Sequence, residues 1–281
     1  MKITSVELYS NNKHAASFSF RDPGALNPYI VQGIFGLDAD EIIPKFYSLS
    51  PDGLNKYYDL TLRNREIVIR VALNPNTDLK KTYSELRDDL YRAISSSRTG
   101  LIQLRFNNNL STVAAISGRI TKFEAPHFNQ TPEVQLTVKC SDYFLRALDP
   151  VEVNYYILET PTTIVDPFST APHGFSLNIK FTADTPSFIM RDSDTPSWIF
   201  TVTPGVIGAN TGFKINDELY FSSENDKQIY IVRASTKIQL VDKVQPGSFW
   251  PMMFPGENDF EVVTGTFTWG YLTYYPTYWG V

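Results

Sequence analysis

Alternation between apolar and polar side chains constrains this sequence more than any other feature. In Val134–Cys140 every second residue is apolar, so these side chains would line one face of a strand. The runs Ile67–Leu73 and Ile102–Phe106 alternate in the same way, as do Leu60 and Leu62 over a shorter stretch. β-Branched and aromatic residues are frequent in these runs, which is typical of strands. The first half of the chain is therefore predicted to be mainly β.

A tight reversal is predicted at Asn64, between the runs Tyr57–Leu62 and Glu66–Leu73. Asn tolerates the left-handed backbone angles that a short turn needs. The arginines on either side of it are not turn formers, which argues against a two-residue hairpin.

One segment departs from the alternation and has helical spacing. Its apolar residues recur at steps of three or four: Leu79, Tyr83, Leu86, Leu90 and Ile94. Charged residues occupy other positions, as in an amphipathic helix. The spacing predicts a helix over Leu79–Ser96, with Thr77 or Asp78 as its N-cap and Ser95–Ser97 at its stop. One helix among many strands is expected to pack on a sheet.

A domain boundary is predicted near Leu148, because prolines accumulate between Leu148 and Gly174. This divides the 281 residues into domains 1–148 and 149–281, in line with roughly 150 residues per domain. Val151–Leu158 is either the first strand of the second domain or a linker strand. Short strands separated by turn residues follow: Phe175–Phe181, Trp198–Val202, Glu218–Phe221, Gln228–Val232, Lys237–Val241, Phe260–Val263 and Thr266–Tyr271. Many short strands without a helical pattern predict a β-sandwich.

Charge and cysteine content argue against several classes of protein. Lys and Arg number 25 against 30 Asp and Glu, a net charge of −5, and no basic run is present, so direct nucleic-acid binding is disfavoured. The single cysteine, Cys140, cannot form an intramolecular disulfide, which fits assembly in a cytoplasm. Glu7 interrupts the N-terminus before a signal peptide's apolar core, and Pro, Gly and Thr break the two long uncharged stretches. We expect a soluble protein without membrane insertion.

The sequence predicts no catalytic residue, no cofactor and no metal ligand. His14, His127 and His173 lie more than forty residues apart and are expected on loops at the surface. Cys140 occupies the apolar register of its strand and is expected in the core. Gly33–Gly36 has no third glycine and no following helix, so it is expected to be a turn between strands.

Neighbouring carboxylates are expected on solvated faces and in turns: Asp40–Glu41, Asp88–Asp89, Asp217–Glu218, and Asp192 with Asp194. The run from Asp192 to Asp194 resembles a fragment of a calcium loop, but it lacks the glycine and the terminal glutamate of such loops. A turn is the favoured interpretation.

Aromatic residues crowd the end of the chain: Phe267, Trp269, Tyr271, Tyr274, Tyr275, Tyr278 and Trp279. Their rings would either stack on sugars or be buried against a neighbouring protein. The interface is the favoured interpretation.

The order and spacing of these segments resemble the distal tail (Dit-like) proteins of long-tailed, siphovirus-type bacteriophages. The similarity covers most of residues 26–147, through Tyr29–Leu37, Tyr58–Ile69, Thr82–Tyr91, Ile116–Ile120 and Val134–Phe144. Phe249–Phe260 also contains the Pro-Gly-x-Asn turn that precedes a late strand of that family's second domain. Independently of the family, Pro255-Gly256 predicts a turn.

The resemblance implies a split β-barrel with one helix in 1–148 and a galectin-like β-sandwich in 149–281. It implies a non-enzymatic hub in the virion, at the phage tail tip or baseplate, assembled in the bacterial cytoplasm. Six copies would close into a ring that joins the tail tube protein to a tail-tip hub protein or tail-associated lysin, with side fibres or receptor-binding proteins attached in some cases. DNA would pass through the lumen, which we expect to be neutral to negative, because exposed cations would bind phosphate.

A carbohydrate-binding β-sandwich module for attachment to the host surface is the alternative. It rests on the sandwich-like second half and on four tryptophans: Trp198, Trp250, Trp269 and Trp279. The residue set of galectin sugar sites is not assignable here, so sugar binding does not follow from the fold alone. A tail-associated hydrolase ranks third, because no acid/base constellation is visible.

Overall fold

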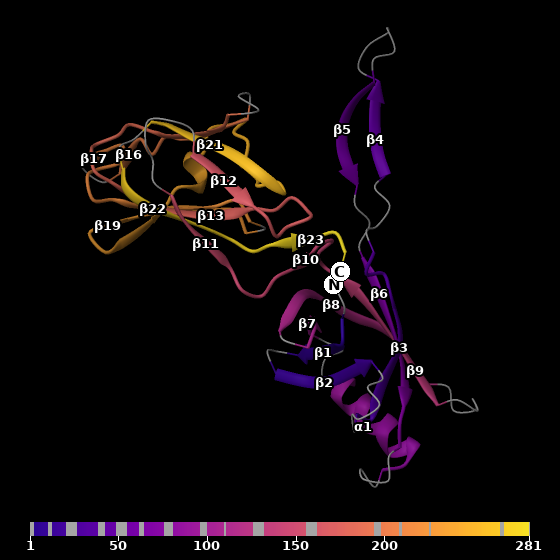
Figure 1. The fold of residues 1–281 in the computed structure, drawn as a ribbon. Helices are drawn as coiled ribbons and strands as arrows, with labels where there is room; N and C mark the ends of the chain where they lie inside the picture. Colours follow the sequence, from indigo (N-terminus) through magenta and orange to yellow (C-terminus); the bar gives the residue numbers. More distant parts are fainter. Residues whose placement is uncertain are drawn as a thin grey trace. The chain divides into compact units, whose positions relative to one another are not determined.

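The computed structural model describes residues 3–10, 13–20, 27–38, 43–48, 55–61, 65–75, 81–95, 100–109, 111–125, 132–155, 162–193, 198–207, 210–224, 226–264 and 267–280. The chain divides into two compact units (Figure 1). Unit 1 comprises Met1–Leu148 and Tyr278–Val281, and unit 2 comprises Asp149–Thr277. No described helix is long and apolar enough to cross a membrane.

Unit 1 is built on a seven-stranded barrel. Its strands are β1 (Ser5–Ser10), β2 (Lys13–Phe20), β3 (Tyr29–Phe35), β6 (Glu66–Leu73), β7 (Ile102–Asn107), β8 (Thr112–Glu124) and β9 (Glu133–Cys140). They follow the order β8-β7-β1-β2-β3-β6-β9, and β9 pairs back onto β8 to close the barrel. β10 (Leu145–Arg146) continues the sheet beside β8, and β23 (Thr277–Tyr278) follows β10. β4 (Ile43–Ser48) and β5 (Asn55–Thr61) pair only with each other among the described strands.

The barrel is split between β2 and β3. These two strands run parallel and pair only at Ser19 with Ile30 and at Phe20 with Val31, whereas the other barrel pairs are antiparallel and longer. The helix α1 (Tyr83–Ser95) turns Leu86, Leu90 and Ile94 into the core of unit 1. The predicted split barrel with one helix is therefore present in the described part of the chain.

Alternation gives the barrel its core, as the sequence predicts. Ile67, Ile69 and Val71 on β6 are buried, and so are Val134 and Val138 on β9. Their registers match, with Ile67 opposite Val138 and Val71 opposite Val134. Apolar side chains from both strands consequently enter the same interior.

The helix begins later than its apolar spacing suggests. It starts at Tyr83, because Thr82 and Glu85 form a capping box: the Thr82 N–H donates to Glu85 Oε2 (2.7 Å), and the Glu85 N–H donates to Thr82 Oγ1 (3.3 Å). The prediction of Leu79 as the first residue was wrong, and Tyr83 is exposed rather than part of a buried stripe. The predicted caps Thr77 and Asp78 lie outside the described residues.

The predicted reversal at Asn64 does not produce a hairpin between its flanking runs. β5 pairs with β4, and β6 pairs with β3 and β9 instead. β6 pairs with an apolar strand on each side in the barrel, and the residues of the turn alone do not predict these distant partners. Asn64 itself lies outside the described residues.

Unit 2 is a β-sandwich, in agreement with the predicted fold class. One sheet has the order β11 (Val151–Tyr155), β22 (Phe267–Tyr274), β13 (Phe175–Phe181), β18 (Glu218–Ser222), β19 (Gln228–Arg233) and β20 (Thr236–Gln239). The other has the order β12 (Thr162–Asp166), β21 (Gly256–Thr264), β14 (Phe188–Asp192) and β15 (Ile199–Val202). The short strands β16 (Val206–Ile207) and β17 (Asn210–Thr211) form a separate pair, and a 3₁₀ turn spans Val241–Lys243.

The two sheets share a core rich in phenylalanine. Phe175, Phe181 and Phe221 enter it from the six-stranded sheet, and Phe188 and Phe200 enter it from the four-stranded sheet. β11 pairs with β22, so Val151–Tyr155 supplies the first strand of this unit, and the rest of the predicted run to Leu158 lies outside the described residues. The strands β12 and β14 were not predicted.

The predicted Pro-Gly-x-Asn turn is present at the start of β21. Gly256 has a φ of 97°, which an L-residue rarely adopts. The buried Asn258 side chain completes the turn by accepting from the Phe254 N–H (2.7 Å) and donating to the carbonyls of Phe254 (2.8 Å) and Gly256 (3.0 Å).

Candidate functional site

The histidines do not all behave as surface residues. His14 is exposed on β2, and its Nε2 lies 2.7 Å from Ser17 Oγ. His173 is buried in unit 2, so its predicted surface position was wrong. Its two ring nitrogens face acceptors, with Nε2 2.8 Å from Asp166 Oδ2 and Nδ1 2.9 Å from the Gly174 carbonyl. His127 lies outside the described residues.

Asp166 is the centre of this buried polar cluster. Its Oδ1 accepts from the backbone N–H groups of Phe168 and Ser169, both at 3.1 Å. Burial works to raise the pKa of Asp166, but the hydrogen bonds from Ser169, His173 and Phe168 outweigh it and lower that pKa. The carboxylate is thereby held ionised by the donors around it.

Tyr274 covers the His173 ring, with the two ring centroids 5.1 Å apart and the planes 15° apart. Burial, together with the charge of Asp166, raises the pKa of Tyr274 to about 12. A phenol with this pKa stays protonated at neutral pH and serves as a donor rather than a base.

This cluster has a structural role. The side chains of His173 and Asp166 are 4 % and 0 % exposed, so a substrate has no access to them. Their loop also holds Thr277, whose N–H donates to Ser169 Oγ (3.1 Å) and whose Oγ1 donates to the Ala171 carbonyl (3.2 Å). The cluster thus fixes the end of unit 2, close to the point where the chain enters unit 1.

The remaining candidates have structural explanations as well. Cys140 is buried in the core of unit 1, as predicted. Gly33 lies inside β3 beside a register shift rather than in a turn, so that prediction was wrong. Gly36 follows the strand with a φ of 83°, and a Cβ there would overlap the Glu66 carbonyl oxygen.

The carboxylate pairs are partly solvated and partly buried. Asp88 is exposed, as expected. Asp217 closes a turn with Lys214, as predicted, but it is buried and forms an ion pair with Arg233 at 2.6 Å, so the prediction that it is solvated was wrong. Asp192 ends β14, next to the bend at Ser193. Asp40, Glu41 and Asp194 lie outside the described residues, and the described ones contain no cluster able to hold a metal ion.

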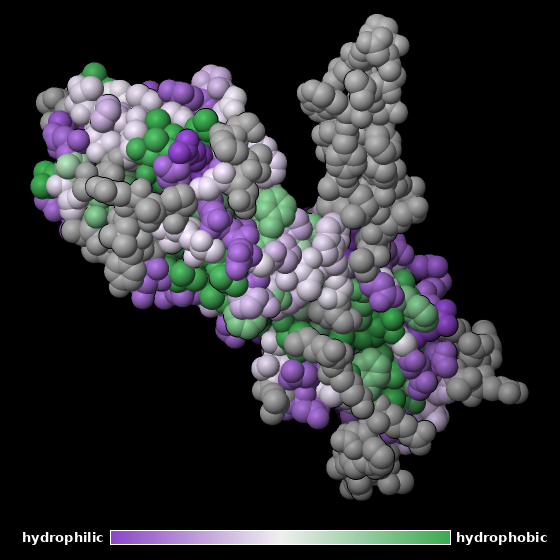
Figure 2. Space-filling model, turned by 45° about the horizontal axis from the view of Figure 1, so that its top comes forward, coloured by the Kyte–Doolittle hydropathy of each residue, from purple (hydrophilic) through white to green (hydrophobic). Residues whose placement is uncertain are grey.

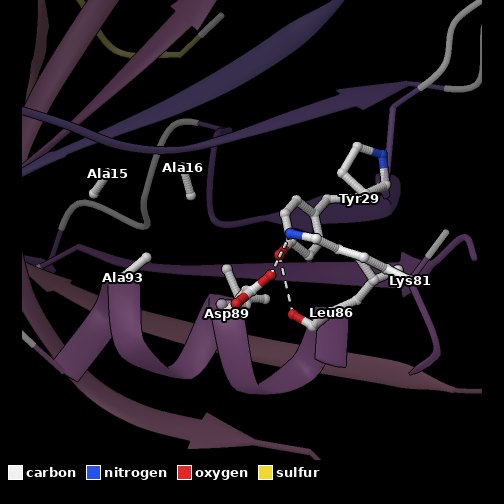
Figure 3. A pocket seen from close by; sticks show the side chains of 9 residues that line it. Ala15, Ala16, Tyr29, Lys81, Leu86, Asp89 and Ala93 are labelled. Atoms are coloured by element: carbon white, nitrogen blue, oxygen red, sulfur yellow. Dashed lines mark hydrogen bonds and ion pairs between the residues drawn. The ribbon is translucent and has the colours of Figure 1, made fainter. Parts of the chain in front are cut away.

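A cavity of about 220 Å³ lies in unit 1 beside the split of the barrel. Ala15 and Ala16 of β2, Tyr29 of β3, and Leu86 and Leu90 of α1 contribute to its mostly apolar wall. Figure 3 shows the labelled side chains converging on this space from the helix and from the strands. The helix does not fill the split completely.

The polar groups of the cavity are already paired. Tyr29 donates to the Leu86 carbonyl (3.0 Å), and Lys81 Nζ lies 2.6 Å from Asp89 Oδ2 (Figure 3). Burial and the charge of Asp89 raise the pKa of Tyr29 to about 12, and the hydrogen bond from Lys81 lowers the pKa of Asp89. Neither group is poised for proton transfer at neutral pH.

Each tryptophan side chain that the structure describes packs on a neighbouring aromatic ring. Trp198 stacks on Phe249, with centroids 4.6 Å apart, and Trp250 packs on Phe221 and the core of unit 2. Trp279 belongs to unit 1, and its ring meets Phe144 edge-on at 4.7 Å. The side chain of Trp269 lies outside the described residues.

Apolar side chains reach the surface of the barrel unit. Those that are largely exposed are Phe35, Tyr83, Tyr91 and Leu101. Figure 2 shows hydrophobic residues, in green, among polar ones on the face in view. Single exposed apolar residues of this kind are common on protein surfaces.

Comparison with solved structures identifies the fold. The Dit protein (gp 19.1) of phage SPP1 matches with a TM-score of 0.65 at 11 % sequence identity, over 97 % of this chain and 98 % of that chain. This chain has the Dit fold. SPP1 Dit is described as a paradigm of the hub of the adsorption apparatus in phages that infect Gram-positive bacteria. At 11 % identity, the likeness establishes the Dit fold, and it confirms the predicted fold class.

Two baseplate structures of phage P2 in the activated conformation match the chain with lower TM-scores. The one with Ca gives a TM-score of 0.45 at 7 % identity, over 97 % of both chains. The one with Sr gives 0.44 at 8 % identity, over 96 % of this chain and 97 % of that chain. At these TM-scores they add nothing to the assignment of the fold. No protein-family model and no curated protein matches the sequence.

Proposed function

We propose that this protein is a structural hub of a phage tail tip or baseplate, and that six copies close into a ring through unit 1. The supporting observation is the likeness to SPP1 Dit, which extends over nearly the full length of both chains. A match that includes the barrel and the sandwich in one chain is more specific than a match to either architecture alone.

The split of the barrel favours assembly with sister copies. β2 and β3 share only two residue pairs, so most of the facing margin of each strand has no partner strand in the described part of the chain. Strand margins of this kind are natural donors for joining a second chain. A ring needs two different surfaces of each subunit to meet, and the margins and the exposed Phe35 and Leu101 supply candidates.

The proposed ring would join the tail tube protein on one side to a tail-tip hub protein or tail-associated lysin on the other. Side fibres or receptor-binding proteins are further proposed partners, and the mature location is the virion. DNA would pass through a neutral to negative lumen, in line with the net charge of −5. A strongly basic lumen in an assembled ring would contradict this.

The proposed role is non-enzymatic. The buried Asp166–His173 pair is closed to substrates, and the polar groups at the helix-side cavity are paired with one another. Hydrolysis of cell-wall polymer by the purified chain would overturn this part of the proposal.

Mass photometry of the purified chain across a concentration series tests the ring. We expect a species of six times the 31.9 kDa chain mass, and we expect Leu101→Asp to reduce its share. Leu101 is 55 % exposed in unit 1, and the control Val206→Asp changes a residue 72 % exposed in unit 2. A charge at the interface would cost binding free energy, whereas the control should assemble like the wild type. If the two variants assembled equally well, Leu101 would not lie in the interface between subunits.

A further inference from the structure

We propose that the outer face of the six-stranded sheet of unit 2 binds a neutral glycan, over β13 between Tyr220 and Tyr271. This activity would be additional to the hub role and does not depend on it. One line of paired residues crosses all six strands in the order Asn154, Tyr271, Asn178, Tyr220, Tyr230 and Gln239.

All six residues of this line point away from the phenylalanine core. Their neighbours along each strand, such as Leu272, Ile179 and Leu219, are buried, and alternation turns the line to the other face. Tyr271 is 46 % exposed, and Asn154 and Gln239 are exposed as well. The line is made of amides and phenols and contains no charged residue.

The ring of Tyr220 is held in place by contacts with two neighbouring strands. It stacks on Tyr230 with centroids 4.8 Å apart and planes 23° apart, and its hydroxyl lies 3.2 Å from Ser176 Oγ. Lys237 Nζ covers the Tyr230 ring at 3.6 Å. Since Tyr230 occupies one face of Tyr220, the opposite face is turned towards β13 and β22.

Asn178 forms the floor of this space, and Tyr271 forms its far side. Among the described residues, no hydrogen bond engages the Asn178 side-chain amide, which is half-buried on β13. Tyr271 and Tyr220 flank Asn178 on the two neighbouring strands. Their backbones are therefore two strand spacings apart, about 10 Å.

This backbone spacing exceeds the separation that a sugar ring needs between two aromatic rings. Carbon atoms pack at about 3.5–4 Å, so a pyranose between two aromatic rings needs about 8 Å. The C–H groups of the sugar would face the tyrosine rings, while its hydroxyl groups would bond to the Asn178 amide, which both donates and accepts. Aromatic walls over a polar floor give a pyranose both kinds of contact.

Charge selects the class of glycan. The ionic side chains nearest to Asn178 along the sheet are Lys180 and Glu218, which pair with each other at 3.9 Å and cancel. Ser176 and Thr273 are uncharged neighbours on the other side of Asn178. Further out on this face, Lys237 lies over Tyr230 and Glu152 stands opposite Thr273, so charges of both signs surround an uncharged centre. Such a centre favours neutral hexose units over phosphate-rich wall polymers.

Saturation-transfer NMR and calorimetry with the full chain test the proposal. The probes are neutral trisaccharides of glucose, galactose and N-acetylglucosamine, with poly(glycerol phosphate) as the anionic comparison. We expect saturable binding of at least one neutral trisaccharide, with a Kd of about 1 mM, as befits a shallow site. Absence of binding for all three, or stronger binding of the anionic polymer, would overturn the proposal.

Two variants locate the site. Asn178→Ala and Tyr271→Ala should each weaken binding about tenfold, through the lost hydrogen bonds and the lost ring contact. Tyr91→Ala is the matched control, because this tyrosine of unit 1 is 45 % exposed. Thermal melting would verify that all three variants fold. Undiminished binding in both site variants would place the sugar elsewhere and contradict the proposal, and mass photometry of the same variants would report ring assembly separately.

Discussion

At the scale of single residues, the buried Asp166 carries the most testable consequence. Asp166→Asn should lower the free energy of unfolding of unit 2 by about 3 kcal/mol, because it removes one partner of a buried pair and leaves His173 without its carboxylate. Urea denaturation followed by tryptophan fluorescence measures this. The control Asp88→Asn, at an exposed carboxylate, should change stability by less than about 0.5 kcal/mol. A similar loss of unfolding free energy in both variants would show that the buried cluster contributes no more to stability than an exposed carboxylate does.

The same carboxylate predicts a pH dependence. Because its pKa is lower in the folded chain than the usual unfolded value of about 3.9, the folded state is stabilised fully above that value. The contribution is lost as the pH falls through the folded pKa. The gap in unfolding free energy between wild type and Asp166→Asn should therefore shrink as the pH is lowered from 6 to 2. A gap independent of pH would mean that the ionised form is not the one stabilised.

At the scale of elements, the turn after β3 depends on a glycine for two separate reasons, and a matched pair of variants separates them. Gly36 and Gly247 have nearly equal φ values, 83° and 84°, but only the Cβ added at Gly36 meets other atoms. Gly247→Ala should lower the free energy of unfolding by about 1 kcal/mol, because alanine is strained in the left-handed backbone conformation. Gly36→Ala should lower it by about 3 kcal/mol, because the Glu66 carbonyl must also move. Thermal melting and urea titration measure the free energy of unfolding of both variants. Equal losses in the two variants would show that the Glu66 carbonyl does not obstruct a side chain at position 36.

Much of this element structure follows from local pattern. The alternation of apolar and polar residues was sufficient to predict the strands β6, β7, β9 and β13, whose inward residues are all apolar. It did not predict which strands pair when the partners are distant in the sequence: β5 pairs with β4, and β14 lies between β15 and β21. The buried Asp166–His173 pair escaped prediction for the same reason, because only the fold brings those side chains together.

At the scale of the whole molecule, the chain leaves unit 1 at Leu148 and re-enters it at Tyr278. The sandwich is thus connected to the barrel unit by two covalent crossings rather than one. Inside unit 1 the buried Arg65 donates to the carbonyls of Leu37 and Trp279, which anchors the returning segment. The sequence did not reveal this return, because a four-residue segment carries no pattern of its own.

Electron microscopy of the purified chain most directly tests the proposal that this chain with the Dit fold assembles into a ring. Class averages should show closed annuli with six-fold symmetry and outward density for six copies of unit 2. Isolated single-chain particles at every concentration, with and without a tail tube protein, would contradict the account.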